Sequence, residues 1–124
     1  KGIIGRLYTA SYHAPVYSEI NDKIFSYMKE LEDSLVLDVG GNVGSFSDKR
    51  ILPILKKNKY YRLDIDPETV PDLAAQSSNI PIKDGSVDFI ICKSVLEHIP
   101  DYQKTIAEMH RILRKGSGLY FFLH

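Results

Sequence analysis

The chain has 124 residues, of which 44% are hydrophobic, and this size and composition suit one globular domain. Its 16 basic and 16 acidic side chains cancel, which argues against nucleic acid or an acidic membrane surface as a partner. It has no apolar run near the roughly 20 residues of a membrane span, no signal-peptide core and one cysteine, Cys92, so an intrachain disulfide is excluded. We therefore expect a cytoplasmic protein that acts on a small molecule, with Cys92 as a buried and unreactive thiol.

The first predicted elements are a helix and a strand. Residues 17–32 repeat apolar side chains at three- and four-residue spacing, which is typical of a helix with one buried face. The run "SLVLDVG" over residues 34–40 is short and rich in Val and Leu, and it predicts a strand covered on both faces. We accordingly divide the chain into an N-terminal helical cap over residues 1–33 and a core over residues 34–124.

The middle of the chain alternates further between helix and strand. The segment "SFSDKRILPILKKN" has a helical pattern, and Pro53 is expected to kink or split this helix. Residues 59–64, "KYYRLD", predict a second strand. Pro71 leaves room for at most one helical turn before it, and "DLAA" predicts a short third strand.

The last third of the chain predicts strand, helix and strand. The run "SVDFIICK" follows the turn signal "KDGS" and predicts a buried strand. Apolar side chains mark one face of a helix over residues 101–114, and Gly116 is expected to end it. A fifth strand is predicted for "GLYFFLH" at residues 118–124. Strands that alternate with helices predict an α/β fold with parallel strands and right-handed crossovers.

The glycine-rich turn after the first strand limits which class of ligand the chain could bind. A dinucleotide fingerprint aligned on Gly40 needs glycine at two positions where the chain has Asn42 and Ser45, which argues against a nicotinamide-dependent oxidoreductase. The turn also lacks the lysine of a phosphate-binding loop. Asp38, just before the glycines, favours a ligand that is cationic or rich in hydroxyls and would repel a triphosphate. S-adenosylmethionine fits because it carries an ammonium, a sulfonium and a ribose diol.

Four segments of the chain resemble, in order and spacing, the motifs of the class I S-adenosylmethionine-dependent methyltransferases, particularly the type 11 group. They are "VLDVGGNVGSFS", "YYRLDIDPE", "NIPIKDGSVDFIICKSVLEHIPD" and "EMHRILRKGSGLYFFLH". The resemblance covers residues 35–124 and implies a Rossmann-like three-layer sandwich with a mostly parallel sheet in the strand order 3-2-1-4-5. It also implies S-adenosyl-L-methionine as cofactor and methyl transfer to an O, N or C nucleophile of a small molecule. The family's sheet usually has further strands, so the chain is expected to lack the final ones and to be part of a longer polypeptide.

By this resemblance, the turn after the first strand holds the methionine part of the cofactor. Asp38 is expected near the methionine amino group, although an acid at this place can also simply cap a turn. Gly40, Gly41 and Gly44 would let the backbone approach the ligand, since a Cβ atom would occupy its space. Asn42 stands where the family usually has glycine, and asparagine tolerates left-handed backbone angles better than other residues do.

The second strand and the loop after the third are expected to hold the adenosine. Asp64 would accept hydrogen bonds from both ribose hydroxyls, and Ile65 would pack beside the adenine. Asp66 is expected to cap the following turn instead of binding the cofactor. Gln76 and Ser77 stand where the family reads the adenine edge, and the Gln76 amide oxygen could accept from the exocyclic amine; a solvated loop is the plainer alternative.

The fourth strand ends beside the expected position of the methyl group. Lys93 and Ser94 would flank it, chiefly through backbone carbonyls. The catalytic residue is unknown: His98 is a weak candidate for a general base because its position more often braces a helix start, and His124 is a second weak candidate. The histidines show no metal-ligand spacing, so no metal is expected.

Two functions remain open on the sequence alone. The chain is either a methyltransferase that acts on a small molecule or a non-catalytic module that binds S-adenosylmethionine, since Asn42 and Gln76 replace usual residues of the family. The run "LYFFL" would also leave the fifth strand as an exposed apolar edge, which predicts further polypeptide or self-association at that edge.

Overall fold

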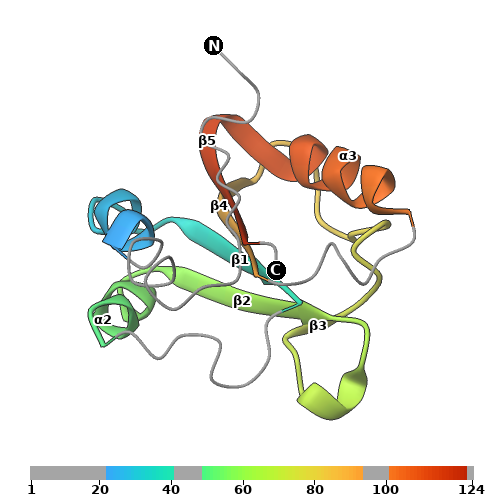
Figure 1. The fold of residues 1–124 in the computed structure, drawn as a ribbon, viewed down its shortest axis with the longest axis horizontal. Helices are drawn as coiled ribbons and strands as arrows, with labels where there is room; N and C mark the ends of the chain where they lie inside the picture. Colours follow the sequence, from blue (N-terminus) through green and yellow to red (C-terminus); the bar gives the residue numbers. More distant parts are fainter. Residues whose placement is uncertain (1–21, 41–48, 94–100, 123–124) are drawn as a thin grey trace.

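The computed structural model describes residues 22–40, 49–93 and 101–122, which form a five-stranded parallel sheet flanked by helices (Figure 1). The strand order is β3-β2-β1-β4-β5, which confirms the predicted α/β class and topology. The strands are β1 (Leu35–Val39), β2 (Lys59–Asp64), β3 (Leu73–Ala74), β4 (Val87–Lys93) and β5 (Leu113–Phe122). The helices are one over residues 22–28, α2 (Ile51–Lys56), the 3-10 turn η1 (Pro67–Thr69) and α3 (Tyr102–Ile112).

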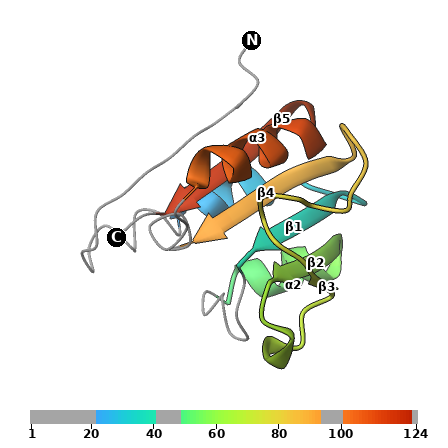
Figure 2. The same cartoon turned by 90° about the vertical axis from the view of Figure 1, so that its right-hand side faces the viewer.

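The sheet separates two apolar clusters, so that the molecule has three layers (Figure 2). Along β1, Leu37 and Val39 join the cluster on the α3 side, whereas Val36 joins the cluster on the other side. This alternation is the period of two that a strand buried on both faces requires. The helices therefore lie on the two faces of the sheet, and the edge where the strands end is left for loops.

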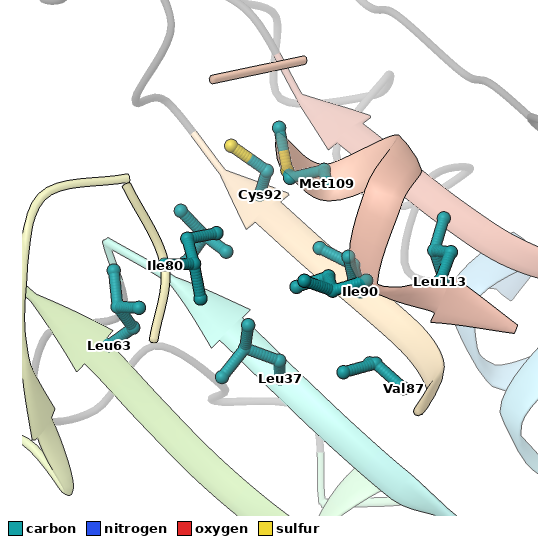
Figure 3. Close-up of a cluster of buried hydrophobic side chains, with 10 residues drawn as sticks. Leu37, Leu63, Ile80, Val87, Ile90, Cys92, Met109 and Leu113 are labelled. Carbon is teal, nitrogen blue, oxygen red and sulfur yellow. The ribbon is translucent and has the colours of Figure 1, made fainter. Parts of the chain in front are cut away.

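The cluster on the α3 side brings together strands that are far apart in the chain (Figure 3). Its buried members come from β1, β2, the segment before β4, β4, α3 and the start of β5: Leu37, Val39, Leu63, Ile80, Val87, Ile90, Cys92, Met109, Ile112 and Leu113. Cys92 is 1% exposed, as the apolar run around it predicted, and it is in no disulfide. Among these aliphatic side chains, Cys92 fills space as a small apolar residue.

The cluster on the opposite face joins the sheet to the N-terminal helix. Ile24 and Met28 of the helix over residues 22–28 are 1% and 0% exposed and pack with Ile51 and Ile54 of α2. Asn58, just after α2, donates from its side-chain amide to the carbonyls of Leu31, beyond the N-terminal helix, and of Ile54 in α2, and its amide oxygen accepts from the Ser34 N–H before β1. The predicted division of the chain at residue 33 stays a prediction.

Pro53 lies where a helix tolerates proline. Residues 49 and 50 form a turn, and α2 begins at Ile51, so Pro53 is the third residue of the helix. Backbone N–H groups in the first turn have no helical acceptor, and proline costs little there. The residues before 49 that were expected to be helical lie outside the described ones.

The end of α3 differs from the prediction. The helix ends at Ile112 and β5 begins at Leu113, whereas the sequence predicted helix to residue 114 and a stop at Gly116. Gly116 instead lies inside β5 with φ of +86°. There, Val87 and Phe89 of β4 pair with Leu113 and Gly118, so a step of two residues on β4 faces a step of five on β5. A glycine at positive φ accommodates such a bulge without the clash of a Cβ atom.

Candidate cofactor-binding edge

Three strands end at one edge of the sheet, which we call the carboxyl edge and define by the strand ends Val39, Asp64 and Lys93. Because the strands are parallel, loops that leave these ends meet at the same side. Gly40 follows β1 directly, and its backbone N–H donates to the Leu63 carbonyl of β2 at 2.7 Å. Its φ of +73° is left-handed, which glycine adopts without steric cost. Gly40 therefore departs from strand conformation at the place where the glycine motif predicted a turn.

Asp38 is a buried carboxylate on the face of β1 that is opposite to α3. It is 1% exposed, although an ionised carboxylate in an apolar interior needs compensation by hydrogen bonds. The Tyr60 hydroxyl of β2 donates to Asp38 Oδ2 at 2.6 Å. Burial, followed by the negative charge of Asp38 and this hydrogen bond, raises the pKa of Tyr60 far above the usual range. The phenol therefore stays protonated and remains a donor at physiological pH.

Asp64 is the last residue of β2 and begins a chain of local hydrogen bonds. Its Oδ1 accepts from the Asp66 backbone N–H at 2.9 Å, and Asp66 Oδ1 accepts from the Glu68 N–H at 3.0 Å. Asp66 is the N-cap of η1, which confirms the prediction that it caps the turn. Ile65, between the two acids, is 64% exposed, so the surface beside Asp64 carries a large apolar side chain.

The loop between β2 and β3 is held by Arg62. One guanidinium nitrogen of Arg62 donates to the carbonyls of Thr69 at 3.1 Å and Val70 at 2.6 Å, and its backbone N–H donates to Asp72 Oδ2 at 2.8 Å. Val70 has a φ of +51°, which is unusual for a β-branched residue. The shape of this loop therefore depends on the strand beneath it.

The segment after β3 is fastened to α3. The hydroxyls of Ser77 and Thr105 lie 2.9 Å apart, and Glu108 accepts from the Ile80 N–H at 2.8 Å. Arg111 donates to the carbonyls of Ile80 and Ile82 and pairs with Glu108. The Ser77 side chain is thus used in packing against α3, and the exposed Gln76 precedes it.

Several predicted site residues lie outside the described part of the chain, namely Gly41, Asn42, Gly44, Ser94, His98 and His124. Lys93 is described as the last residue of β4, paired with Phe122 of β5. Among the described residues, no three His, Cys, Asp or Glu side chains gather in a way that could hold a metal ion. Within the same ranges, no helix has the length and apolar character that crossing a membrane requires.

The contact between Tyr60 and Asp38 was not anticipated from the sequence. The alternation in "KYYRLD" puts Tyr60 and Tyr61 on opposite faces of β2, but which one faces Asp38 depends on the register between β1 and β2. In the structure, Tyr60 pairs with Val36 and Arg62 pairs with Asp38. The Tyr60 side chain therefore leans along β2 toward the carboxyl edge to meet Asp38.

Comparisons with known proteins agree with this architecture. The family described as a methyltransferase domain matches residues 37–121. An uncharacterised protein of Methanocaldococcus jannaschii is 30% identical over 110 residues, which cover 81% of this chain and 46% of that protein. A Methanococcus maripaludis protein provisionally assigned as an S-adenosyl-L-methionine-dependent methyltransferase has a similar crystal structure, with a TM-score of 0.66 and 20% identity over 87% of this chain and 55% of that one.

A third similar structure was determined with ligands. It is geranyl diphosphate C-methyltransferase from Streptomyces coelicolor, in complex with Mg²⁺, geranyl diphosphate and S-adenosyl-L-homocysteine. Its TM-score is 0.63 at 10% identity, over 83% of this chain and 44% of that one, so the likeness is one of fold. The chain spans about half the length of the proteins it matches. With more than half of its residues matched, the chain belongs to the methyltransferase domain family of type 11, whose cofactor is S-adenosyl-L-methionine.

Proposed function

We propose that the chain binds S-adenosyl-L-methionine at the carboxyl edge and transfers its methyl group to an O, N or C nucleophile of a small molecule. The observation that carries the proposal is the position of Asp38 and Asp64. The register pairs Asp38 with Arg62, and the alternation along β2 assigns Asp64 to the same face of the sheet. Gly40, directly after β1, has a left-handed backbone and donates from its N–H to the Leu63 carbonyl of β2.

The chemistry of these residues fits the cofactor. S-adenosyl-L-methionine presents an ammonium group and a ribose diol, which are hydrogen-bond donors and need acceptors. Asp38 would accept from the ammonium, and Asp64 would accept from both hydroxyls of the diol. The exposed Ile65 would cover one side of the adenine, with Gln76 at its edge. Gly40 would let the backbone approach because it has no Cβ atom.

When bound, the cofactor would supply an electrophilic methyl group: the acceptor would take it by in-line displacement as the carbon–sulfur bond breaks and S-adenosyl-L-homocysteine leaves, and the acceptor's proton would pass to solvent or a base. The residues of the chain mainly hold and orient the reactants and exclude water, which can account for a large part of such a rate enhancement. Lys93, at the end of β4, would border the methyl group through its backbone. No base is assigned, and an acceptor that is already nucleophilic needs none.

The partners follow from the same reasoning. A small-molecule acceptor is favoured over nucleic acid because the chain carries no net charge. The outer strand of the sheet next to β4 is β5, with ten residues, and a long edge strand readily pairs with another strand. Further polypeptide or a second copy at this edge therefore remains our proposal, as does a cytoplasmic location.

Calorimetric titration with S-adenosyl-L-homocysteine tests cofactor binding. We expect saturable binding that is weakened on the order of 100-fold in Asp64→Ala, because two hydrogen bonds to a carboxylate are lost. Asp84→Ala is the matched control, since this carboxylate precedes β4 at the opposite edge of the sheet and its side chain is 80% exposed. Absence of binding by the unsubstituted chain, or equal effects of the two substitutions, would contradict the proposal.

Transfer of a labelled methyl group separates the two functions that the sequence left open. The chain would be incubated with S-adenosyl-L-methionine labelled on the methyl carbon and with pools of small-molecule thiols, alcohols, amines and carbon acids. Label in a product would support an enzyme. Binding without transfer to any pool would support a non-catalytic module, which the coverage of only about half of the related proteins makes a specific alternative.

A further inference from the structure

We infer that Tyr60 is a positioning residue for the cofactor: its hydroxyl orients the buried Asp38 carboxylate to receive the amino group of the methionine moiety. This inference rests on the proposed function and adds a residue that lies on β2, outside the glycine-rich motif. Tyr60 OH and Asp38 Oδ2 are 2.6 Å apart, a short distance that is typical of a hydroxyl bound to a carboxylate.

A carboxylate at the end of a strand needs such a partner to hold one orientation. The terminal torsion of an aspartate side chain has broad wells, so the backbone alone does not determine where its oxygens point. Asp38 is 1% exposed, and leaving a buried oxygen without a donor would be costly. By occupying Oδ2, the Tyr60 hydroxyl selects one of the possible orientations before any ligand arrives. Such preorganisation raises affinity by reducing the cost of ordering on binding.

The chemical type of the donor also suits a cationic ligand. A phenol satisfies a carboxylate without adding a positive charge of its own, whereas a lysine or arginine would neutralise it. Tyr60 is half-buried and packs against the cluster on the α2 side, so its ring is itself held in place. Arg62, which pairs with Asp38 between β1 and β2, directs guanidinium hydrogen bonds to the carbonyls of Thr69 and Val70. Tyr60 thus supplies a neutral donor to Asp38, whose carboxylate could also accept hydrogen bonds from an ammonium group.

The test compares two ligands that differ in the moiety which Asp38 would bind. S-adenosyl-L-homocysteine carries the amino group, whereas 5′-methylthioadenosine has the same nucleoside and sulfur but no amino-acid part. Tyr60→Phe removes the hydroxyl and keeps the ring. We expect roughly tenfold weaker binding of S-adenosyl-L-homocysteine and unchanged binding of 5′-methylthioadenosine, measured by calorimetry and by ligand-observed NMR titration for the weaker ligand.

Tyr61→Phe is the matched control. Tyr61 is the next residue on β2, faces the other side of the sheet and is 43% exposed, so its substitution should affect neither ligand. A double-mutant cycle with Asp38→Asn adds an independent measurement: the effect of Tyr60→Phe on S-adenosyl-L-homocysteine should largely disappear when the carboxylate is absent. Circular dichroism would verify that each variant is folded.

The outcomes distinguish this inference from the proposed function. If the unsubstituted chain binds S-adenosyl-L-homocysteine but Tyr60→Phe weakens both ligands equally, or neither, Tyr60 has only a structural role and the inference is wrong. Additive effects in the cycle would overturn it as well. If the unsubstituted chain binds neither ligand, the proposed function fails, and the inference fails with it.

Discussion

Replacing Arg111 by methionine should strongly destabilise the fold, because this side chain fastens the segment before β4 to α3. Its guanidinium donates to the carbonyls of Ile80 at 2.8 Å and Ile82 at 2.9 Å, and it makes two hydrogen bonds with Glu108 at 2.8 and 2.9 Å. The Arg111 side chain is 32% exposed, so each of these charged hydrogen bonds should contribute near the low end of the usual range. With about 1 kcal/mol for each carbonyl and about 1 kcal/mol for the Glu108 pair, we expect a loss of about 3 kcal/mol.

Urea unfolding followed by circular dichroism measures this loss through linear extrapolation of the unfolding free energy. Lys104→Met on the same helix is the control, because Lys104 and its partner Asp101 are 72% and 56% exposed and 3.6 Å apart. Such a surface pair should contribute less than about 0.5 kcal/mol. The reasoning is refuted if Arg111→Met lies within about 0.5 kcal/mol of the unsubstituted chain, or if both substitutions cost the same.

Three further predictions concern buried or half-buried polar groups. The hydrogen bond from Arg111 lowers the pKa of Glu108 below its ordinary value. The stability that ionised Glu108 contributes is therefore present above that ordinary value and is lost as the pH falls below it. Glu108→Gln should flatten the decline of the unfolding free energy in urea below about pH 4.5, and an unchanged decline would contradict this. The raised pKa of Tyr60 means that its stabilisation is lost as the pH rises above about 10, and Tyr60→Phe should remove one late-ionising phenol from the alkaline absorbance titration; an identical titration curve would count against it. Asn58→Ala removes hydrogen bonds to three backbone groups and should lower the unfolding free energy by about 2 kcal/mol, whereas a loss below about 0.5 kcal/mol would show that water replaces them.

The strands were largely predictable because their side chains repeat with a period of two or form buried apolar runs. Residues 59–64 are predicted and observed as β2, and β4 begins one residue later than predicted. The start of β5 was not predictable from local sequence. A glycine after a helical pattern signals a helix end, and the same glycine at positive φ also suits a bulge, so the pairing with β4 decides between them.

The candidate site divides in the same way between local and long-range features. The cap formed by Asp66 was predictable, because Pro67 follows it and the hydrogen bond spans two residues. The partner of Asp38 was not, since Tyr60 is 22 residues away and meets it only through the register of β1 and β2. The cofactor roles of Asp38 and Asp64 remain predictions, supported by the position of both acids at the carboxyl edge.

The backbone conformation of Val70 affects how the loop between β2 and β3 would respond to substitutions. A β-branched residue with φ of +51° is disfavoured by its own sterics, so the connection from β2 to β3 is shaped against local preference. The Arg62 side chain stabilises this loop by donating a hydrogen bond to the Val70 carbonyl. Glycine at position 70 would remove this steric conflict, whereas loss of the Arg62 side chain would remove the hydrogen bond that holds the loop in place. The shape of the loop beside Asp64 therefore depends on Val70 and Arg62, two residues that need not touch any ligand.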